Sequence, residues 1–255
     1  MTVTLSFREE IAVIVLDRPA ALNALSFEVL KRLDDAFVEV AASAARALVV
    51  TGAGPKAFCA GADIAELRNR SLMDQKRGAE FGQRVFSRLN ALPIASIAVI
   101  NGYAFGGGLE MALAATFRIV LPQAKLGLPE IKLGLIPGYG GTQRLPRLVG
   151  EARALEIIMT GRTVTANEAV AIGLANRLVE GDPVEAGLAF AREFTGFGLP
   201  ALAMAREAVT RALDVPLQEG LRIEADLSTL AYQTSDAEEG MSAFLEKRQP
   251  QFRDA

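Results

Sequence analysis

Histidine is absent from this sequence of 255 residues, and cysteine occurs once, as Cys59. Catalytic Ser-His-Asp and Cys-His systems are therefore impossible, as are classical zinc and iron sites. We expect no metal ion, although a carboxylate-bound magnesium ion stays chemically possible. Acid–base chemistry near neutral pH falls to carboxylates whose pKa is raised by their surroundings. A single cysteine also excludes an intrachain disulfide, which fits a reducing compartment.

Basic residues are not in excess either, since the sequence contains 27 Lys and Arg and 30 Asp and Glu, which gives a formal net charge of −3. Such a chain has no general basic surface for nucleic acid or acidic lipid. The longest apolar strand, IAVIVL (Ile11–Leu16), ends at Asp17, far short of a membrane span, and the start MTVTLSFREE has no signal-peptide pattern. We expect a soluble cytoplasmic protein with no membrane or nucleic-acid partner.

Strands and helices are predicted to alternate over about the first 180 residues. Two apolar runs around Arg8 predict a β-hairpin, and Ser26 is a suitable N-cap for the helix that follows. Further on, the pattern predicts strands at 47–52, 94–101 and 117–121, and helices at about 74–92 and up to 115. This order favours an α/β fold with mostly parallel sheets.

Only helical periodicity remains from Pro183 onward, in segments 184–194, 201–213, 217–232 and 236–248. Helical tails of this kind often pack on a neighbouring subunit as well as on their own core. We therefore expect a core over residues 1–195 and a helical C-terminal region for oligomerisation over 196–255.

Two carboxylates, Glu110 and Glu130, stand in apolar, glycine-rich surroundings. Glu110 follows Gly106-Gly107-Gly108, which favours a ligand close to open backbone N–H groups at a helix start. Glu130 follows Pro129 and precedes a second glycine run, GLIPGYGG. The alternatives are a first-turn glutamate favoured by the helix dipole and an exposed loop carboxylate.

A third glycine-rich segment, Thr51–Leu67 (TGAGPKAFCAGADIAEL), also exposes backbone N–H groups, and Asp63 is placed to cap the turn after it. Gly-Pro-Lys-Ala does not satisfy the P-loop pattern. The alternative is an ordinary loop between a strand and a helix.

Together these segments resemble the crotonase superfamily, the enoyl-CoA hydratase/isomerase family. The resemblance covers nearly the whole chain, and its motifs occur in the family's order: LDRPAALNAL, KAFCAGADI, NGYAFGGGLEMALAATFRI, PEIKLGLIPGYGGTQRLPRLVG and GMSAFLEKRQPQF. It implies a spiral of repeated ββα units, a helical C-terminal region, and trimers or dimers of trimers. It implies an acyl-CoA thioester substrate and no separate cofactor.

Site residues follow from the same resemblance. It implies that the backbone N–H groups of Ala62 and Gly107 form an oxyanion hole for the thioester carbonyl oxygen. Glu110 and Glu130 match the catalytic glutamates of hydratases, with Glu130 expected to protonate Cα and Glu110 to activate water, which Gly138 helps to hold. The positions matched to CoA contacts are Lys56, Ala60, Asp63, Ile64, Phe244 and Lys247, the last two expected from a neighbouring subunit. Ala20 departs from the family, in which a basic residue is common there, and so leaves one phosphate contact in doubt.

Three functions stay open. Hydration of a 2-enoyl-CoA in fatty-acid or related acyl degradation is favoured because both glutamates are present. Enoyl-CoA isomerisation is the alternative, since one carboxylate can move a proton between Cα and Cγ. A non-catalytic RNA-binding or scaffold protein is a further alternative, which the acidic net charge disfavours.

Overall fold

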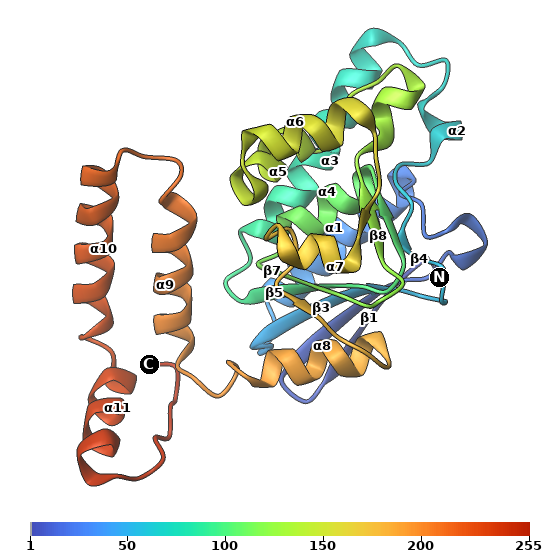
Figure 1. Cartoon of the computed structure of the whole chain (residues 1–255). Coiled ribbons are helices and arrows are strands. Elements are labelled where there is room, and N and C mark those ends of the chain that lie inside the picture. Colours follow the sequence, from blue (N-terminus) through green and yellow to red (C-terminus); the bar gives the residue numbers. More distant parts are fainter. Residues whose placement is uncertain (1) are drawn as a thin grey trace. The chain divides into compact units, whose positions relative to one another are not determined.

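The computed structural model describes residues 2–255, in one compact unit that ends at Ala191 and a second that begins at Arg192. The strands all lie in the first unit (Figure 1). None of the helices described in this range has the length and apolarity of a membrane span.

A six-stranded sheet forms the base of the first unit, with the strand order β1-β2-β3-β5-β7-β10. Its strands are β1 (Val3–Arg8), β2 (Ile11–Leu16), β3 (Ala47–Gly52), β5 (Ala95–Ile100), β7 (Phe117–Val120) and β10 (Arg177–Leu178). The first two form the predicted antiparallel hairpin, in which Val3 pairs with Leu16, and the other neighbours are parallel. Strand β3 is buried throughout, as expected for a central parallel strand with an apolar sequence.

A second, four-stranded sheet has the order β4-β6-β8-β9. Its strands are β4 (Ala57–Cys59), β6 (Tyr103–Phe105), β8 (Lys125–Gly127) and β9 (Val164–Thr165). Along the chain, the pairs β3–β4, β5–β6 and β7–β8 each give one strand to each sheet before a helical segment follows. This repetition is the spiral of ββα units that the family resemblance implies.

Helical segments fill the connections of the first unit. They are η1 (Pro19–Ala21), α1 (Phe27–Ala41), α2 (Ile64–Leu67), α3 (Leu72–Asn90), α4 (Gly107–Ala114), η2 (Pro129–Leu133), α5 (Gly141–Val149), α6 (Glu151–Thr160), α7 (Ala166–Ala171) and α8 (Pro183–Arg192). Ser26 caps α1 as predicted, by accepting a 3.2 Å hydrogen bond from the Val29 N–H. Helix α3 begins two residues before the predicted position 74, because Ser71 provides a cap that accepts from the Asp74 N–H.

Two of these helices show how the core is built. Every residue of α4 is buried, which fits its apolar sequence. On the opposite side of the six-stranded sheet, α8 packs so closely that a Cβ at Gly187 would lie 2.6 Å from a methyl group of Val49 (Figure 1). The first catalytic candidate, Glu110, therefore lies on a buried helix.

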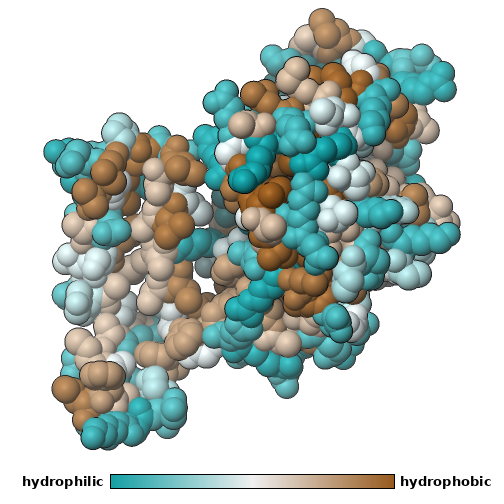
Figure 2. Space-filling model, in the orientation of Figure 1, coloured by the Kyte–Doolittle hydropathy of each residue, from teal (hydrophilic) through white to brown (hydrophobic). Residues whose placement is uncertain are grey.

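The second unit contains only helices, as the periodicity predicts: α9 (Leu199–Arg211), α10 (Leu217–Ala231) and α11 (Ser235–Glu246). Neither α9 nor α10 has a buried residue. Figure 2 shows hydrophobic residues among hydrophilic ones on the surface of this unit. Its large exposed apolar side chains include those of Val209, Leu213, Leu217, Leu221, Leu230, Tyr232, Met241, Phe244 and Leu245.

Candidate active site

Glu110 lies in the first turn of α4, and one of its carboxylate oxygens is held by backbone N–H groups. Its Oε1 accepts hydrogen bonds from the N–H of Tyr139 (2.8 Å) and the N–H of Gly141 (2.7 Å). The second glycine run of the sequence thus directs its open N–H groups at the first glutamate. Within the described residues, the hydrogen bonds from Tyr139 and Gly141 are both made to Oε1, so neither of them occupies Oε2.

The side chain of Glu110 is almost completely buried, with 1% of the residue exposed. Burial raises its pKa to about 7, against the opposing effect of the backbone hydrogen bonds from Gly141 and Tyr139, and the nearby charge of Glu130 raises it further. A carboxyl group with a pKa in this range can hold or release a proton at neutral pH, as expected from the absence of histidine.

Glu130 follows Pro129 in the short helix η2, and its carboxylate lies against the glycine turn before α4. A Cβ at Gly106 would be 2.8 Å from Glu130 Oε1, so only glycine leaves room for this approach. Gly106 also has a positive φ of 49°, which glycine adopts readily. Within the described residues, the buried Oε2 of Glu130 has no hydrogen-bond partner. Burial raises the pKa of Glu130 as well.

The glycines at 61 and 106 bring the two predicted oxyanion-hole positions together. A Cβ at Gly61 would lie 3.1 Å from the Phe105 carbonyl oxygen and 3.9 Å from the Gly107 nitrogen. Ala62 directly follows Gly61 and pairs with Leu25, whose own N–H and C=O are used by Gly61 and Asp63. In the part of the chain that the structure describes, the N–H groups of Ala62 and Gly107 donate to no protein acceptor.

Tyr139 and Gly138 form the side of the site next to Gly107. A Cβ at Gly107 would be 3.1 Å from the Tyr139 ring, whereas a Cβ at Gly138 would meet nothing within 4 Å. Burial raises the pKa of the Tyr139 phenol to about 12, so this group stays protonated at neutral pH. Gly138 therefore borders open space beside Glu110, where its predicted role of holding water stays a prediction.

Two of the predicted CoA contacts, Ala60 and Asp63, lie in the loop before α2, and a third, Ile64, is the first residue of that helix. Asp63 caps this helix, as expected, by accepting from the Ala65 N–H, and its other oxygen pairs with Arg18 at 3.3 Å. Its side chain thus fastens the loop that carries Ala62. Ala60 uses its N–H to bind the Leu22 carbonyl, and Ile64 is 47% exposed. Contacts with CoA at these positions, and at the exposed Lys56, stay predictions.

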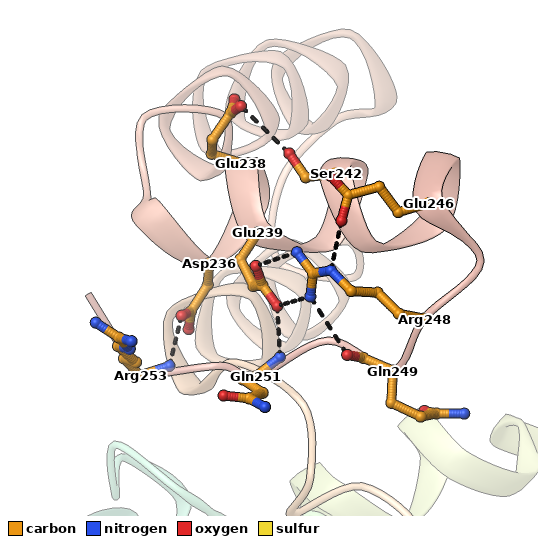
Figure 3. Close-up of polar contacts among 9 residues, drawn as sticks. All are labelled: Asp236, Glu238, Glu239, Ser242, Glu246, Arg248, Gln249, Gln251 and Arg253. Atoms are coloured by element: carbon orange, nitrogen blue, oxygen red, sulfur yellow. Dashed lines mark hydrogen bonds and ion pairs between the residues drawn. The ribbon is translucent and has the colours of Figure 1, made fainter.

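The remaining two candidates, Phe244 and Lys247, belong to the helical unit. Phe244 is 83% exposed, and Lys247 ends α11 in a left-handed conformation with a φ of 55°. Beside them, Arg248 binds both oxygens of Glu239 (2.6 and 2.8 Å) and also Glu246 (2.6 Å), while Glu239 accepts from the Gln251 N–H (Figure 3). The chain after α11 is thereby folded back on this helix.

The sequence did not single out several residues that support the site. Arg18 holds the loop before α2, and Gln83 of α3 donates to the Gly138 carbonyl. Arg144 of α5 donates to the Asn90 side chain, and burial lowers its pKa, while the charge of Glu110 opposes that effect. Each acts on a partner that is distant in sequence, so local patterns contain no signal for it.

Comparison with known proteins identifies the family of this chain. The family model for enoyl-CoA hydratase/isomerase matches residues 6–255. The chain is 39% identical to a crotonyl-CoA hydratase of Syntrophomonas wolfei, over 98% of this chain and 97% of that protein. It is 37% identical to a short-chain-enoyl-CoA hydratase of Clostridium acetobutylicum, over 94% and 92% respectively.

A solved structure confirms the predicted fold class. The crystal structure of an enoyl-CoA hydratase from Bacillus anthracis superposes with a TM-score of 0.95 at 36% identity and covers 100% of both chains. The match therefore includes the strands, the helices of the spiral and the C-terminal helices. The chain belongs to the enoyl-CoA hydratase/isomerase family of enzymes, the crotonase family.

Proposed function

We propose that this enzyme is an enoyl-CoA hydratase, which adds water to a trans-2-enoyl-CoA and yields the 3-hydroxyacyl-CoA. The observation that carries the proposal is a pair of carboxylates, Glu110 and Glu130, both with a raised pKa and close enough for the charge of Glu130 to raise the pKa of Glu110. Hydration needs one group that accepts a proton and one that donates a proton. A pair that shares a single proton supplies both.

In the proposed chemical step, each of these groups has one role. The oxygen of water attacks Cβ as Glu110 removes a proton from it, and the π electrons move toward the thioester oxygen. The N–H groups of Ala62 and Gly107 stabilise the negative charge that develops there, and removal of one such donor typically slows a reaction about 10²–10³-fold. Glu130 then gives its proton to Cα. The proton is now on Glu110, and exchange with solvent restores the pair.

The hydrogen bonding of the individual carboxylate oxygens supports these different roles for Glu110 and Glu130. The Glu110 Oε1 is fixed by the Tyr139 and Gly141 N–H groups, so Oε2 is the oxygen left to bind water. Glu130 Oε2 is buried and has no hydrogen-bond partner among residues 2–255, and a protonated oxygen suits such an environment better than a charged one. The N–H of Gly138, which borders open space, is proposed as a further contact for the water.

We further propose that the nucleotide part of CoA contacts Lys56, the backbone near Ala60 to Ile64, and Phe244 and Lys247 of a neighbouring subunit. This requires a homo-oligomer, a trimer or a dimer of trimers. Support comes from α9 and α10, which have no buried residue and expose large apolar side chains. Apolar surface of this kind is typical of subunit contacts.

Turnover of 2-enoyl-CoA thioesters of several chain lengths tests the reaction. We expect the enoyl-thioester absorbance to fall and 3-hydroxyacyl-CoA to form. Because general acid–base catalysis typically contributes about 10²–10⁴-fold, the Glu130→Gln and Glu110→Gln variants should each lose activity on that scale while they remain folded. Normal hydration by a correctly folded Glu130→Gln variant would refute the assigned mechanism.

Isomerisation is the second candidate, and the unpaired Oε2 of Glu130 is the observation that favours it. A lone carboxylate beside an oxyanion hole is sufficient to move a proton from one carbon to another. A 3-enoyl-CoA distinguishes the two activities. Rapid formation of 2-enoyl-CoA, unaffected in Glu110→Gln, together with slow hydration of that product would assign the isomerase function instead.

A further inference from the structure

Gln83 of helix α3 lies outside the pair of glutamates but is connected to it through a single peptide group. Its Nε2 donates a 2.9 Å hydrogen bond to the carbonyl oxygen of Gly138. The N–H of the same peptide, that of Tyr139, donates to Glu110 Oε1 at 2.8 Å. The two hydrogen bonds thus lie at opposite ends of one planar unit.

Planarity couples these two bonds. The described chain contains no cis peptide bond, so the C=O of Gly138 and the N–H of Tyr139 point in opposite directions. A donor that fixes the carbonyl therefore fixes the direction of the N–H as well. An amide whose carbonyl accepts a hydrogen bond is also polarised, which makes its N–H a stronger donor.

Helix α3 is a firm support for such a contact. Gly82 precedes Gln83, and a Cβ at this glycine would overlap the Tyr139 ring. One turn further along the helix, the Phe86 ring meets the Tyr139 ring edge-on, with centroids 5.8 Å apart. The helix therefore presses against the segment that carries the Glu110 donors.

The segment itself has little regular structure of its own between η2 and α5. Gly134 and Gly140 have left-handed backbone conformations, and a side chain at Gly138 would meet no neighbour within 4 Å. Among the described residues, only the side chains of Gln83 and Glu110 form hydrogen bonds with the peptide group between Gly138 and Tyr139. The orientation of this peptide thus depends on Gln83 and Glu110 together.

We propose that Gln83 is a positioning residue, which orients the Gly138–Tyr139 peptide so that Glu110 is held with one oxygen bound and the other free for water. This inference deepens the proposed hydratase function and rests on it for the role of the water. The hydrogen-bonded connection from Gln83 to Glu110 does not depend on the reaction. Gln83 touches no reacting atom, and its effect passes through Glu110.

The variant Gln83→Met tests this role because it keeps the side-chain length and removes the donor. We expect kcat to fall about tenfold with little change in KM, since the catalytic carboxylate is misplaced by less than the 1 Å shift that typically costs 10²-fold. Gln83→Lys, which restores a donor on a longer stem, should recover part of kcat. Gln83→Glu, which places a carboxylate against the carbonyl oxygen, should recover none.

Gln123→Met is the matched control. Gln123 is also exposed, and its Nε2 likewise donates to a backbone carbonyl, that of Asn101, at 2.9 Å. Gln123 lies in the turn between β7 and β8, and its bond joins this turn to Asn101, directly after β5, not to a residue that donates to Glu110. We expect wild-type kcat, KM and thermal stability from this variant, so that loss of a similar surface hydrogen bond is separated from loss of positioning.

A titration of Glu110 keeps the inference distinct from the proposed function. With ¹³C-labelled glutamate carboxyl groups and Glu110→Gln for assignment, we expect the Glu110 pKa to be higher in Gln83→Met than in Gln123→Met. The reason is that a weaker hydrogen bond from the Tyr139 N–H stabilises the ionised form of Glu110 less. The other groups with an effect on this site, Glu130 of η2, Arg144 of α5 and Tyr139, are the same in both variants.

The outcomes separate cleanly. Unchanged kcat and an unchanged Glu110 titration in Gln83→Met would overturn the role of Gln83. Failure of the wild type to hydrate any 2-enoyl-CoA would overturn the proposed function, while a shifted Glu110 titration would still support the positioning role.

Discussion

At the scale of single residues, the surroundings of Glu110 oppose the ionisation of its side chain at neutral pH. Its pKa is about 7 in the folded protein, compared with an ordinary value of 4.5. Between these values the folded state binds a proton that the unfolded state has released, so stability falls as the pH rises through this window and levels off above it. The ionised carboxylate, which is the form proposed to activate water, therefore lowers the stability of the folded protein.

Replacement of Glu110 by Gln removes the loss of stability that ionisation of Glu110 causes. The rise in pKa from 4.5 to about 7 lowers the free energy of unfolding by about 3 kcal/mol at pH 8 and by about 1 kcal/mol at pH 5. We expect Glu110→Gln to melt several degrees above the wild type at pH 8 and to lose most of that advantage at pH 5. Thermal melting at both pH values measures this.

A stability difference that stays the same from pH 5 to pH 8 would contradict the raised pKa. The matched control is Glu28→Gln, because Glu28 is an exposed glutamate that pairs with Arg32 on the surface of α1. A surface pair of this kind contributes little, so its variant should follow the wild type at both pH values.

The two glutamates could be predicted from the sequence, whereas Gln83 could not. Glu110 and Glu130 carry charge next to glycine runs in apolar segments, which is a local signal. Gln83 stands among the polar residues of an ordinary amphipathic helix, and its partner is 55 positions away. Only the packing of α3 against the segment after η2 gives it a role.

At the scale of elements, α11 shows how the chain that follows a helix can be attached to that helix, in this case to its first turns. Asp236, which is 5% exposed, accepts hydrogen bonds from the N–H groups of Arg253 (2.6 Å) and Asp254 (2.9 Å). Arg248 and Glu239 add the second attachment, at Gln251 (Figure 3). The buried carboxylate is the firmer of the two, since exposed ion pairs contribute little.

We predict that the two attachments can be released separately. Asp236→Ala leaves the N–H groups of Arg253 and Asp254 without their acceptor, and we expect much faster amide exchange across residues 252–255. Arg248→Met should affect mainly the Gln251 amide, because Glu239 is then free to turn toward solvent. Hydrogen–deuterium exchange measured on the C-terminal peptide distinguishes the two patterns.

Arg222→Met is the control, since Arg222 forms an exposed ion pair with Glu219 within α10. Identical exchange of the C-terminal peptide in all three variants and the wild type would contradict this account of the tail.

Several elements were predictable because their signals are local. The hairpin at 3–16, the caps Ser26 and Asp63 and the apolar helix after Gly106 follow from patterns within a few residues. The start of α3 was placed two residues late, because Ser71 and Asp74 are both good capping residues and sequence alone does not rank them. The division of each strand pair between two sheets was implied by the family resemblance, because it depends on contacts far apart in the chain.

At the scale of the whole molecule, the helical unit leaves apolar surface that a single chain does not bury. On α10, Leu217 is 73% exposed and Leu221 is 48% exposed, and the two are one turn apart on the same face. Large exposed side chains of this type favour association, which the proposed trimer or hexamer provides. We predict that the double variant Leu217→Asp, Leu221→Asp dissociates, as light scattering after gel filtration would show by a fall in mass to one chain.

Dissociation also tests where the CoA contacts come from. If Phe244 and Lys247 serve a neighbouring subunit, a monomeric variant keeps Glu110 and Glu130 but lacks these two contacts. KM for the CoA thioester should then rise much more than kcat falls, because binding that is equal in the ground and transition states affects KM alone. Unchanged KM in a confirmed monomer would assign the nucleotide contacts to the same chain, and a wild type that is itself monomeric would refute the proposed assembly.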